Sequence, residues 1–196
     1  MRLLIATTNP GKVREYADLF ANLQFDLVNL ADVGINNDVD ETGATYEANA
    51  LIKAREYAAH SGLLTLADDS GLEVEALQGR PGVYSARYAP DSPTRIQKLL
   101  AELKDVPDDQ RRARFQCVIA LARPDGRTET TQGSCEGWIA HEPRGINGFG
   151  FDPVFYMPEH HATMAELPES FKNAISHRAY AAQKMRIVLE RVLAES

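Results

Sequence analysis

An apolar run that meets two adjacent carboxylates is the feature that most constrains this chain. Leu63, Leu64, Leu66 and Ala67 lead directly into Asp68-Asp69-Ser70-Gly71. Neighbouring side chains of a strand point to opposite faces, so one acid would face the core if the strand continued. We therefore expect the strand to end here, where a turning backbone lets both carboxylates reach one hydrated pocket. Such a pair favours a bound cation, with Mg²⁺ the usual oxygen-seeking candidate. The alternative is a plain acidic turn, because Asp, Ser and Gly favour turns.

The composition is that of a globular protein. The 196 residues, 44% hydrophobic and 25% charged, predict a single domain over residues 1–196 with a substantial core. The net charge of −7 argues against a nucleic-acid partner, because nucleic-acid binders usually carry a basic face. A small anionic ligand is compatible with this charge, since a few lysines and a metal can reverse the potential inside one cleft.

The cysteines and the N-terminus predict a cytoplasmic protein without a membrane partner. Cys117 and Cys135 show no metal-ligand spacing, and Cys117 lies in an apolar run that predicts a core position. Nothing requires a disulfide, which fits a reducing compartment. The N-terminal apolar segment is too short for a signal peptide, and no apolar run approaches membrane-spanning length.

The N-terminal segment has the pattern of an anion-binding loop. Residues 3–7 predict a buried strand, and Thr7-Thr8-Asn9-Pro10-Gly11-Lys12 separates it from a helical pattern. A strand, a polar loop and a helix start in this order present free backbone N–H groups to an anion, and Lys12 adds a point charge. The Walker A pattern is absent. The alternative is an ordinary N-cap followed by a solvent-facing lysine.

The remaining pattern predicts strand–helix units at both ends of the chain and an antiparallel middle. Thr42 or Thr45 is a candidate N-cap for the second helix, which contains Lys53. A Pro124-Asp125-Gly126 turn signal joins two alternating segments into a hairpin. The expected strands cover residues 26–30, 112–123, 128–139 and 154–156, and the expected helices cover residues 45–60, 94–103 and 177–193.

Two segments near the C-terminus carry candidate ligand contacts. The glycine-rich loop over residues 145–153 is either a tight turn with buried rings or a stacking platform, with Asp152 accepting from ring N–H groups. Ser176 fits an N-cap, which places His177 and Arg178 in the first turn of the last helix. Two basic groups at the positive end of a helix oppose its dipole, so they favour a role with a ligand.

Taken together, these motifs resemble one family across nearly the whole chain. The chain resembles the inosine/xanthosine triphosphate pyrophosphatases, which hydrolyse deaminated purine nucleoside triphosphates. Six motifs in order carry the resemblance: Thr7-Thr8-Asn9-Pro10-Gly11-Lys12, Glu41-Thr42-Gly43 with Asn49 and Lys53, Ala67-Asp68-Asp69-Ser70-Gly71-Leu72, Gly79-Arg80-Pro81-Gly82, Gly148-Phe149-Gly150-Phe151-Asp152-Pro153 and Ser176-His177-Arg178.

The resemblance implies a fold, a reaction and an assembly. The implied fold is α/β, with a mixed, twisted sheet, flanking helices and two lobes around a central substrate cleft. The implied reaction is Mg²⁺-dependent cleavage between the α- and β-phosphates of ITP, dITP or XTP, giving a nucleoside monophosphate and pyrophosphate. Such a hydrolase removes damaged nucleotides from the pool before they enter DNA or RNA. The implied assembly is a homodimer.

The resemblance also implies roles for individual residues. Glu41 and Asp69 match the metal-binding acids, and Asp69, with Asp68 beside it, matches the base that activates water. The positions matching substrate contacts are Thr7, Thr8, Asn9, Pro10, Gly11, Lys12, Lys53, Ser70, Phe149, Gly150, Phe151, Asp152, Lys172, His177 and Arg178.

Selectivity for a 6-oxo purine follows from its hydrogen-bonding edge. Oxygen O6 is an acceptor, whereas adenine presents a donor at this position. A cation near O6, which could be Lys172 or Arg178, therefore favours hypoxanthine and xanthine over adenine. Two departures from the family pattern bear on the loop: Thr8 replaces a common glycine, and Pro10 removes one N–H donor. Phe151 stands where relatives carry various aromatics, so we expect stacking to persist.

Two other functions compete with this interpretation. One is a pyrophosphatase for other modified nucleotides, such as pyrimidine triphosphates. The other is a nucleotide-binding module without hydrolysis, against which Lys12, Glu41, Asp68 and Asp69 argue, since a mere binder has no need of a water-activating acid.

Overall fold

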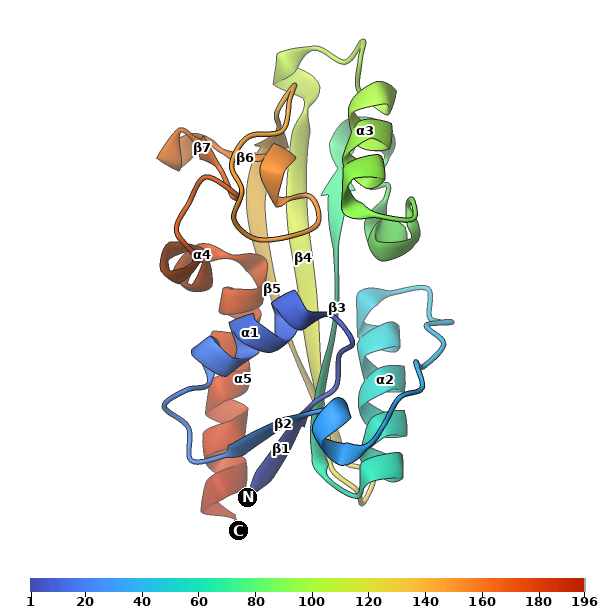
Figure 1. Ribbon diagram of the computed structural model, residues 1–196, viewed down its shortest axis with the longest axis vertical. Helices are drawn as coiled ribbons and strands as arrows, with labels where there is room; N and C mark the ends of the chain where they lie inside the picture. The colour runs from blue at the N-terminus through green and yellow to red at the C-terminus, as the bar shows by residue number, and fades with distance from the viewer. Residues whose placement is uncertain (196) are drawn as a thin grey trace. The chain divides into compact units, whose positions relative to one another are not determined.

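The structure, a computed structural model, describes residues 1–195 and is built on a seven-stranded sheet in the order β2-β1-β3-β4-β5-β6-β7 (Figure 1). The strands are β1 (Arg2–Ile5), β2 (Asp26–Asn29), β3 (Leu64–Val74), β4 (Arg112–Ala122), β5 (Thr128–Ile139), β6 (Phe155–Met157) and β7 (Ala162–Thr163). The α-helices are α1 (Pro10–Leu19), α2 (Tyr46–Ser61), α3 (Ser92–Glu102), α4 (Glu169–Ile175) and α5 (His177–Ala194).

The sheet is mixed, as the resemblance implied. Strand β1 pairs in parallel with both β2 and β3, whereas β6 pairs antiparallel with β5 and β7. Parallel neighbours need long crossovers, and α1 and α2 supply them between β1, β2 and β3. The predicted α/β class, the strand–helix units at the start of the chain and the elements of the middle are confirmed.

The chain divides into two compact units. The first unit comprises residues 1–69, 117–133 and 178–195 of the described chain, and the second comprises residues 70–116 and 134–177. The single domain expected from length stays a prediction.

The core of the first unit lies on both faces of its part of the sheet. Leu3 and Ile5 of β1 pack in one cluster with Tyr16 of α1 and with the apolar side chains of α5. Leu4 packs in another cluster with the alanines of α2. Because side chains alternate along a strand, the short β1 serves two cores, and this explains the unbroken apolar run from Leu3 to Ile5.

The second unit has one core, to which α3 and the strands β3, β4, β5 and β6 contribute. Leu72 of β3, Leu99 of α3 and Phe115 of β4 belong to it, and the ring of Phe115 lies 4.4 Å from that of Phe155. The buried guanidinium of Arg111 donates to the carbonyls at the end of α3 and at the end of β5. These bonds satisfy carbonyl groups that would otherwise lack partners where both elements end.

The prediction that β3 ends at the two carboxylates is wrong. The strand continues as one element through Asp68 and Asp69 to Val74. Each acid therefore projects to its own face of the sheet, and both are buried, at 2% and 6% exposure. An acidic turn at this position is likewise excluded.

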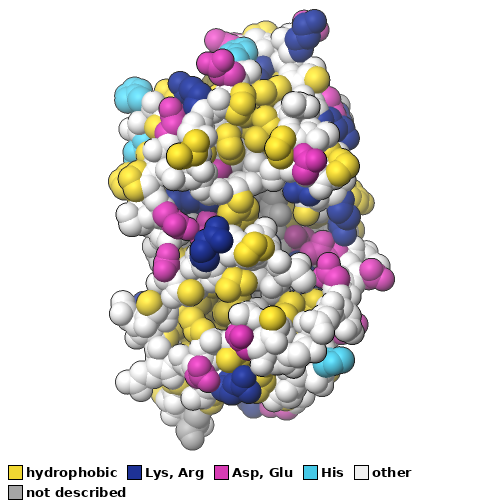
Figure 2. Space-filling view, in the orientation of Figure 1, with side chains coloured by type: hydrophobic (Ala, Val, Ile, Leu, Met, Phe, Trp, Pro, Cys, Tyr) yellow, Lys and Arg dark blue, Asp and Glu magenta, His cyan; other side chains and the backbone are white. Residues whose placement is uncertain are grey.

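The surface carries charges of both signs, and the helices are not strongly apolar, as the composition predicts. Lys and Arg side chains are interspersed with Asp and Glu side chains on the face shown in Figure 2. Within residues 1–195, none of the helices combines the length and the apolar character needed to cross a membrane.

A close approach at Gly137 gives a test of the packing in the second unit. A Cβ atom at this position would lie 2.6 Å from the Phe155 ring and 2.7 Å from the Tyr156 carbonyl oxygen. Gly137→Ala should therefore lower the free energy of unfolding by about 1–3 kcal/mol, measured by urea denaturation. Glu136→Ala, at an exposed position of the same strand, is the control and should change it by less than about 0.5 kcal/mol. Equal stability of both variants would contradict this account of the packing.

Candidate active site

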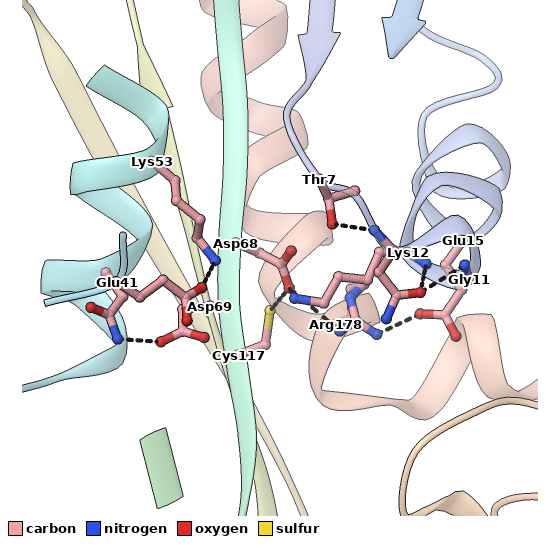
Figure 3. Close-up of polar contacts among 12 residues, drawn as sticks. Thr7, Gly11, Lys12, Glu15, Glu41, Lys53, Asp68, Asp69, Cys117 and Arg178 are labelled. Atoms are coloured by element: carbon pink, nitrogen blue, oxygen red, sulfur yellow. Dashed lines mark hydrogen bonds and ion pairs between the residues drawn. The ribbon is translucent and has the colours of Figure 1, made fainter. Parts of the chain in front are cut away.

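On one face of β3, Asp68 lies in a buried network of charges (Figure 3). Its Oδ2 atom lies 2.9 Å from Nζ of Lys12 and 3.4 Å from Nη2 of Arg178. The thiol of Cys117 also points at this oxygen, at 3.7 Å. Two cations thus surround one carboxylate, which compensates for its removal from water.

Glu15 completes this network, although no sequence motif singled it out. Its Oε2 atom lies 2.5 Å from Nη1 of Arg178, and the side chain is buried. Glu15 follows Gly11 by one helical turn in α1, so both face the same side of the helix. Charges therefore alternate in the order Glu15, Arg178, Asp68 and Lys12, so this group of four has no net charge.

On the other face of β3, Asp69 meets residues of α2 and of the segment before it (Figure 3). Its Oδ2 atom accepts a hydrogen bond of 2.9 Å from Asn49. Lys53, one turn further along α2, forms an ion pair with Glu41. Thr45, one of the two predicted N-caps, caps α2 by accepting from the N–H of Ala48. The helix therefore presents Asn49 and Lys53 side by side toward the two acids.

The two neighbouring carboxylates have opposite pKa shifts. Burial works to raise the pKa of Asp68, but Lys12, Arg178 and Lys53 outweigh it and hold this pKa well below its usual range. Burial raises the pKa of Asp69, and the opposing effects of Lys53 and Asn49 do not cancel it. Asp68 is thus a permanently ionised partner for cations, whereas Asp69 has the higher proton affinity that a base requires.

The lysine of α2 stays charged in this environment. Burial tends to lower the pKa of Lys53, but the carboxylates of Asp68, Asp69 and Glu41 outweigh it, and the pKa is raised. A cation with a raised pKa beside acids remains available for a polyanionic ligand.

The loop before α1 differs from the prediction. Asn9 is the N-cap of α1, and its side chain accepts from the N–H groups of Gly11 and Lys12. Pro10 has no N–H group, and the N–H of Asn9 donates to the hydroxyl of Thr7. The expectation of a row of free backbone donors is therefore wrong, because the helix uses these groups for its own cap. Lys12 is not solvent-facing either, since its ammonium group binds Asp68.

Glu41 and Asp69 have the chemistry of a site for a hard cation. Burial is the main cause of the raised pKa of Asp69, and the negative charge of Glu41 adds to it. Within residues 1–195, no cluster of three or more His, Cys, Asp or Glu side chains could hold a metal ion. Two carboxylates suit Mg²⁺, which usually keeps several waters and binds through one or two carboxylates and substrate phosphates.

A second polar cluster, made by Phe149, Asp152 and Lys172, lies in the second unit. Oδ2 of Asp152 lies 2.5 Å from Nζ of Lys172 and accepts a 2.8 Å hydrogen bond from the N–H of Phe149. Nζ of Lys172 lies 4.6 Å from the centre of the Phe149 ring. A Cβ atom at Gly148 would lie 2.1 Å from Oδ2 of Asp152, so this loop needs glycine there. The cluster combines an aromatic ring with a buried ion pair, which suits a planar ligand that both donates and accepts.

Two predicted ligand contacts belong to the apolar core of the second unit. Phe151 is buried, and its ring packs 6.4 Å from that of Tyr88. Phe151 therefore fits the alternative of a turn with a buried ring, and the partly exposed ring of Phe149 is the one left for stacking. The buried ring of His177 stacks on Phe115 at 4.7 Å.

The structure thus distributes the predicted site residues over two groups. The first unit brings Lys12, Glu41, Lys53, Asp68 and Asp69 around the middle of β3, together with Arg178 from α5. The second unit contains Ser70, Phe149, Gly150, Phe151, Asp152, Lys172 and His177.

Arg178 was one of two candidates for contacting purine O6. Its guanidinium is instead ion-paired with Glu15 and Asp68. Sequence reasoning assigned no role to Glu15 or Asn49; a carboxylate one turn after the loop glycine, and an amide one turn before Lys53, were the available signals.

These features define the class of protein. The fold is a mixed α/β sheet, and the site holds a carboxylate pair suited to a divalent metal, flanked by lysines suited to a polyanion. The chain matches the profile of the Ham1 family over residues 3–188. It belongs to the Ham1 family.

The relatives extend over nearly the whole chain. The dITP/XTP pyrophosphatase of Bacillus subtilis (strain 168) is 47% identical over 95% of this chain and 96% of its own length. That of Desulforamulus reducens is 49% identical, covering 98% and 97% respectively. A HAM1 protein from Coxiella burnetii has a TM-score of 0.88 at 43% identity, covering 97% of this chain and 99% of that one.

Removing the charge of Glu15 tests how much the network depends on its equal numbers of positive and negative charges. Glu15→Gln keeps the shape but leaves Arg178 without its nearest carboxylate, so the free energy of unfolding should fall by about 3–5 kcal/mol. Urea denaturation followed by circular dichroism measures this change. Arg14→Gln, an exposed neighbour in α1, is the control and should stay within about 0.5 kcal/mol of the wild-type protein. A loss below about 1 kcal/mol for Glu15→Gln would contradict the account of the network.

Proposed function

We propose that this protein hydrolyses deaminated purine nucleoside triphosphates, such as dITP, ITP and XTP, to the nucleoside monophosphate and pyrophosphate. The observation that carries the proposal is the pair Asp68 and Asp69 in the middle of β3, with one acid paired to cations and the other of raised pKa beside Glu41. The relatives named dITP/XTP pyrophosphatase support the same substrate class.

Lys12 and Lys53 are the groups proposed to bind the triphosphate. Phosphoryl chemistry depends mainly on positioning and on neutralising the charge of the phosphates. Both lysines lie against site acids, and the ion pairs of Lys12 with Asp68 and of Lys53 with Glu41 hold their ammonium groups in place. Because Asn9 occupies the amides of Gly11 and Lys12, side chains such as those of Thr8 and Lys12 must supply most of this contact.

Glu41 and Asp69 are proposed to hold Mg²⁺. When bound, the ion supplies neutralising charge for phosphate oxygens and lowers the pKa of water. Glu41 contributes one carboxylate from the segment before α2, and Asp69 contributes the other from β3.

Asp69 is the proposed base. It accepts a proton from the attacking water. The water oxygen bonds to the α-phosphorus, and the oxygen that bridges the α- and β-phosphates leaves with pyrophosphate. Asn49 donates to Oδ2 and thereby holds the carboxylate in a defined orientation. Asp68 keeps its negative charge for Lys12 and Arg178, so we assign it a positioning role rather than a share in proton transfer.

Phe149, Asp152 and Lys172 are proposed to recognise the base. The ring of Phe149 offers a stacking surface, the ammonium of Lys172 donates to an oxygen such as O6, and Asp152 accepts from a ring N–H group. A buried donor left unpaired by adenine can discriminate by roughly 10⁴–10⁵-fold. The proposed homodimer and a cleft for the substrate follow from the resemblance and stay predictions.

Release of pyrophosphate from a nucleotide panel tests the function. ITP, dITP and XTP should be hydrolysed with Mg²⁺ and not with EDTA, while ATP should react at least about 10²-fold more slowly, because its 6-amino group presents a donor to Lys172 where these substrates present an acceptor. GTP and dTTP complete the panel. Preferred release from dTTP would favour the pyrophosphatase for other nucleotides. Binding of ITP without hydrolysis of any member would show a nucleotide-binding module.

Replacing the proposed base distinguishes a loss of catalysis from a loss of folding stability. Asp69→Asn should abolish turnover of dITP while keeping the fold, since burial disfavours the charged form of Asp69 and asparagine has nearly the same shape. Steady-state kinetics and thermal denaturation measure the two effects. The matched replacement Asp68→Asn should destabilise the fold, because it leaves Lys12 and Arg178 without their shared carboxylate. Wild-type turnover by Asp69→Asn would rule out the assigned role.

A further inference from the structure

The side chain of Asn49 links two separate parts of the site. It is fully buried, at 0% exposure. Its Nδ2 donates to Oδ2 of Asp69 at 2.9 Å, and its Oδ1 accepts from the N–H of Gly43 at 2.8 Å. Gly43 lies two residues after Glu41, so one amide group contacts both the base and the segment that carries the other acid.

We propose that Asn49 is a positioning residue that couples the carboxylate of Asp69 to the segment carrying Glu41, so that the two acids share one geometry. The kinetic part of this inference rests on the proposed hydrolysis, and its metal-binding part rests on the proposed Mg²⁺ site. Asn49 acts through Asp69 and Glu41.

The hydrogen-bonding partners determine the orientation of the amide. A backbone N–H can only donate, so the atom of Asn49 that faces Gly43 must be the oxygen. The nitrogen then faces Asp69, which accepts as a carboxylate. The side chain therefore cannot flip without breaking both bonds, and it distinguishes the two partners by chemistry.

The backbone at Gly43 is shaped around this side chain. A Cβ atom on Gly43 would lie 2.7 Å from Oδ1 of Asn49 and 2.7 Å from Cβ of Ala48. Any larger residue would push the segment away from α2 and lengthen the bond to Asn49. The close approach is an observation independent of the contact with Asp69, and it shows that the segment before α2 is fitted to the amide.

Helix α2 supports both acids from one face. Asn49 and Lys53 are four residues apart, so their side chains are neighbours on the helix surface. Asn49 binds Asp69, and Lys53 pairs with Glu41. Partners that orient metal ligands typically change metal affinity or activity by 10–100-fold when they are replaced.

Two replacements of Asn49 separate positioning from simple filling of the core. Asn49→Asp keeps an acceptor for Gly43 but removes the donor to Asp69, so kcat should fall about 10–100-fold although the segment stays anchored. Asn49→Leu removes both bonds, and its affinity for Mn²⁺, measured without nucleotide by electron paramagnetic resonance, should fall about 10–100-fold. Unchanged kcat in Asn49→Asp would show that Asp69 does not depend on the donor of Asn49, and that result would overturn the proposal.

The control is Thr45→Ala. It removes the cap of α2, which has no bond to either acid, and should cost about 1 kcal/mol of stability while leaving kcat and Mn²⁺ affinity within twofold. If both Asn49 variants fail to fold, Gly43→Ala decides, because its Cβ displaces Asn49 while keeping the amide. Wild-type Mn²⁺ affinity and kcat in that variant would overturn the proposal.

The outcomes also distinguish the two proposals. If the wild-type protein does not hydrolyse the deaminated nucleotides but Asn49→Leu still weakens Mn²⁺ binding, the proposed function fails and the role of Asn49 stands. If hydrolysis occurs and both Asn49 variants keep wild-type kcat and Mn²⁺ affinity, the function stands and the role of Asn49 fails.

Discussion

Two adjacent carboxylates buried in the middle of one strand are the constraint on which the site depends. Because β3 runs straight through Asp68 and Asp69, each face of the sheet must supply partners for one negative charge. The face of Asp68 receives Lys12 from α1 and Arg178 from α5, and the face of Asp69 receives Asn49 from α2. The helices around β3 therefore do more than cover apolar surface: they bring the cations and donors that make two buried acids tolerable.

In the resulting arrangement, Asp68 binds cations and Asp69 is suited to proton transfer, although the two residues are neighbours in the sequence. Cations keep Asp68 ionised, and this carboxylate in turn holds Lys12 close to the start of α1. Burial gives Asp69 a raised pKa, which suits proton transfer. A buried charge network rarely stabilises a fold more than apolar packing would, so the network around Asp68 is better explained by the positions it gives to Lys12 and Arg178.

The cluster that we propose for base recognition, in the second unit, also pairs a buried carboxylate with a cation. The ion pair of Asp152 and Lys172 is buried, and the loop that carries it is closed by glycines where a Cβ atom would collide. Beside it, Phe151 and His177 pack in the apolar core rather than on a surface. A rigid apolar layer thus supports a small polar group, the usual design of a selective small-molecule site.

Local patterns in the sequence determined most of the elements, because helix caps, turns and apolar periodicity act within a few residues. Asn9 and Thr45 cap α1 and α2, and the strands that flank Pro124-Asp125-Gly126 formed where alternation placed them. Tertiary structure alone decided the course of β3 and the position of Arg178. Glu15 and Arg178 are 163 residues apart in the chain, and a carboxylate can lie in a strand only when such distant partners fold against it.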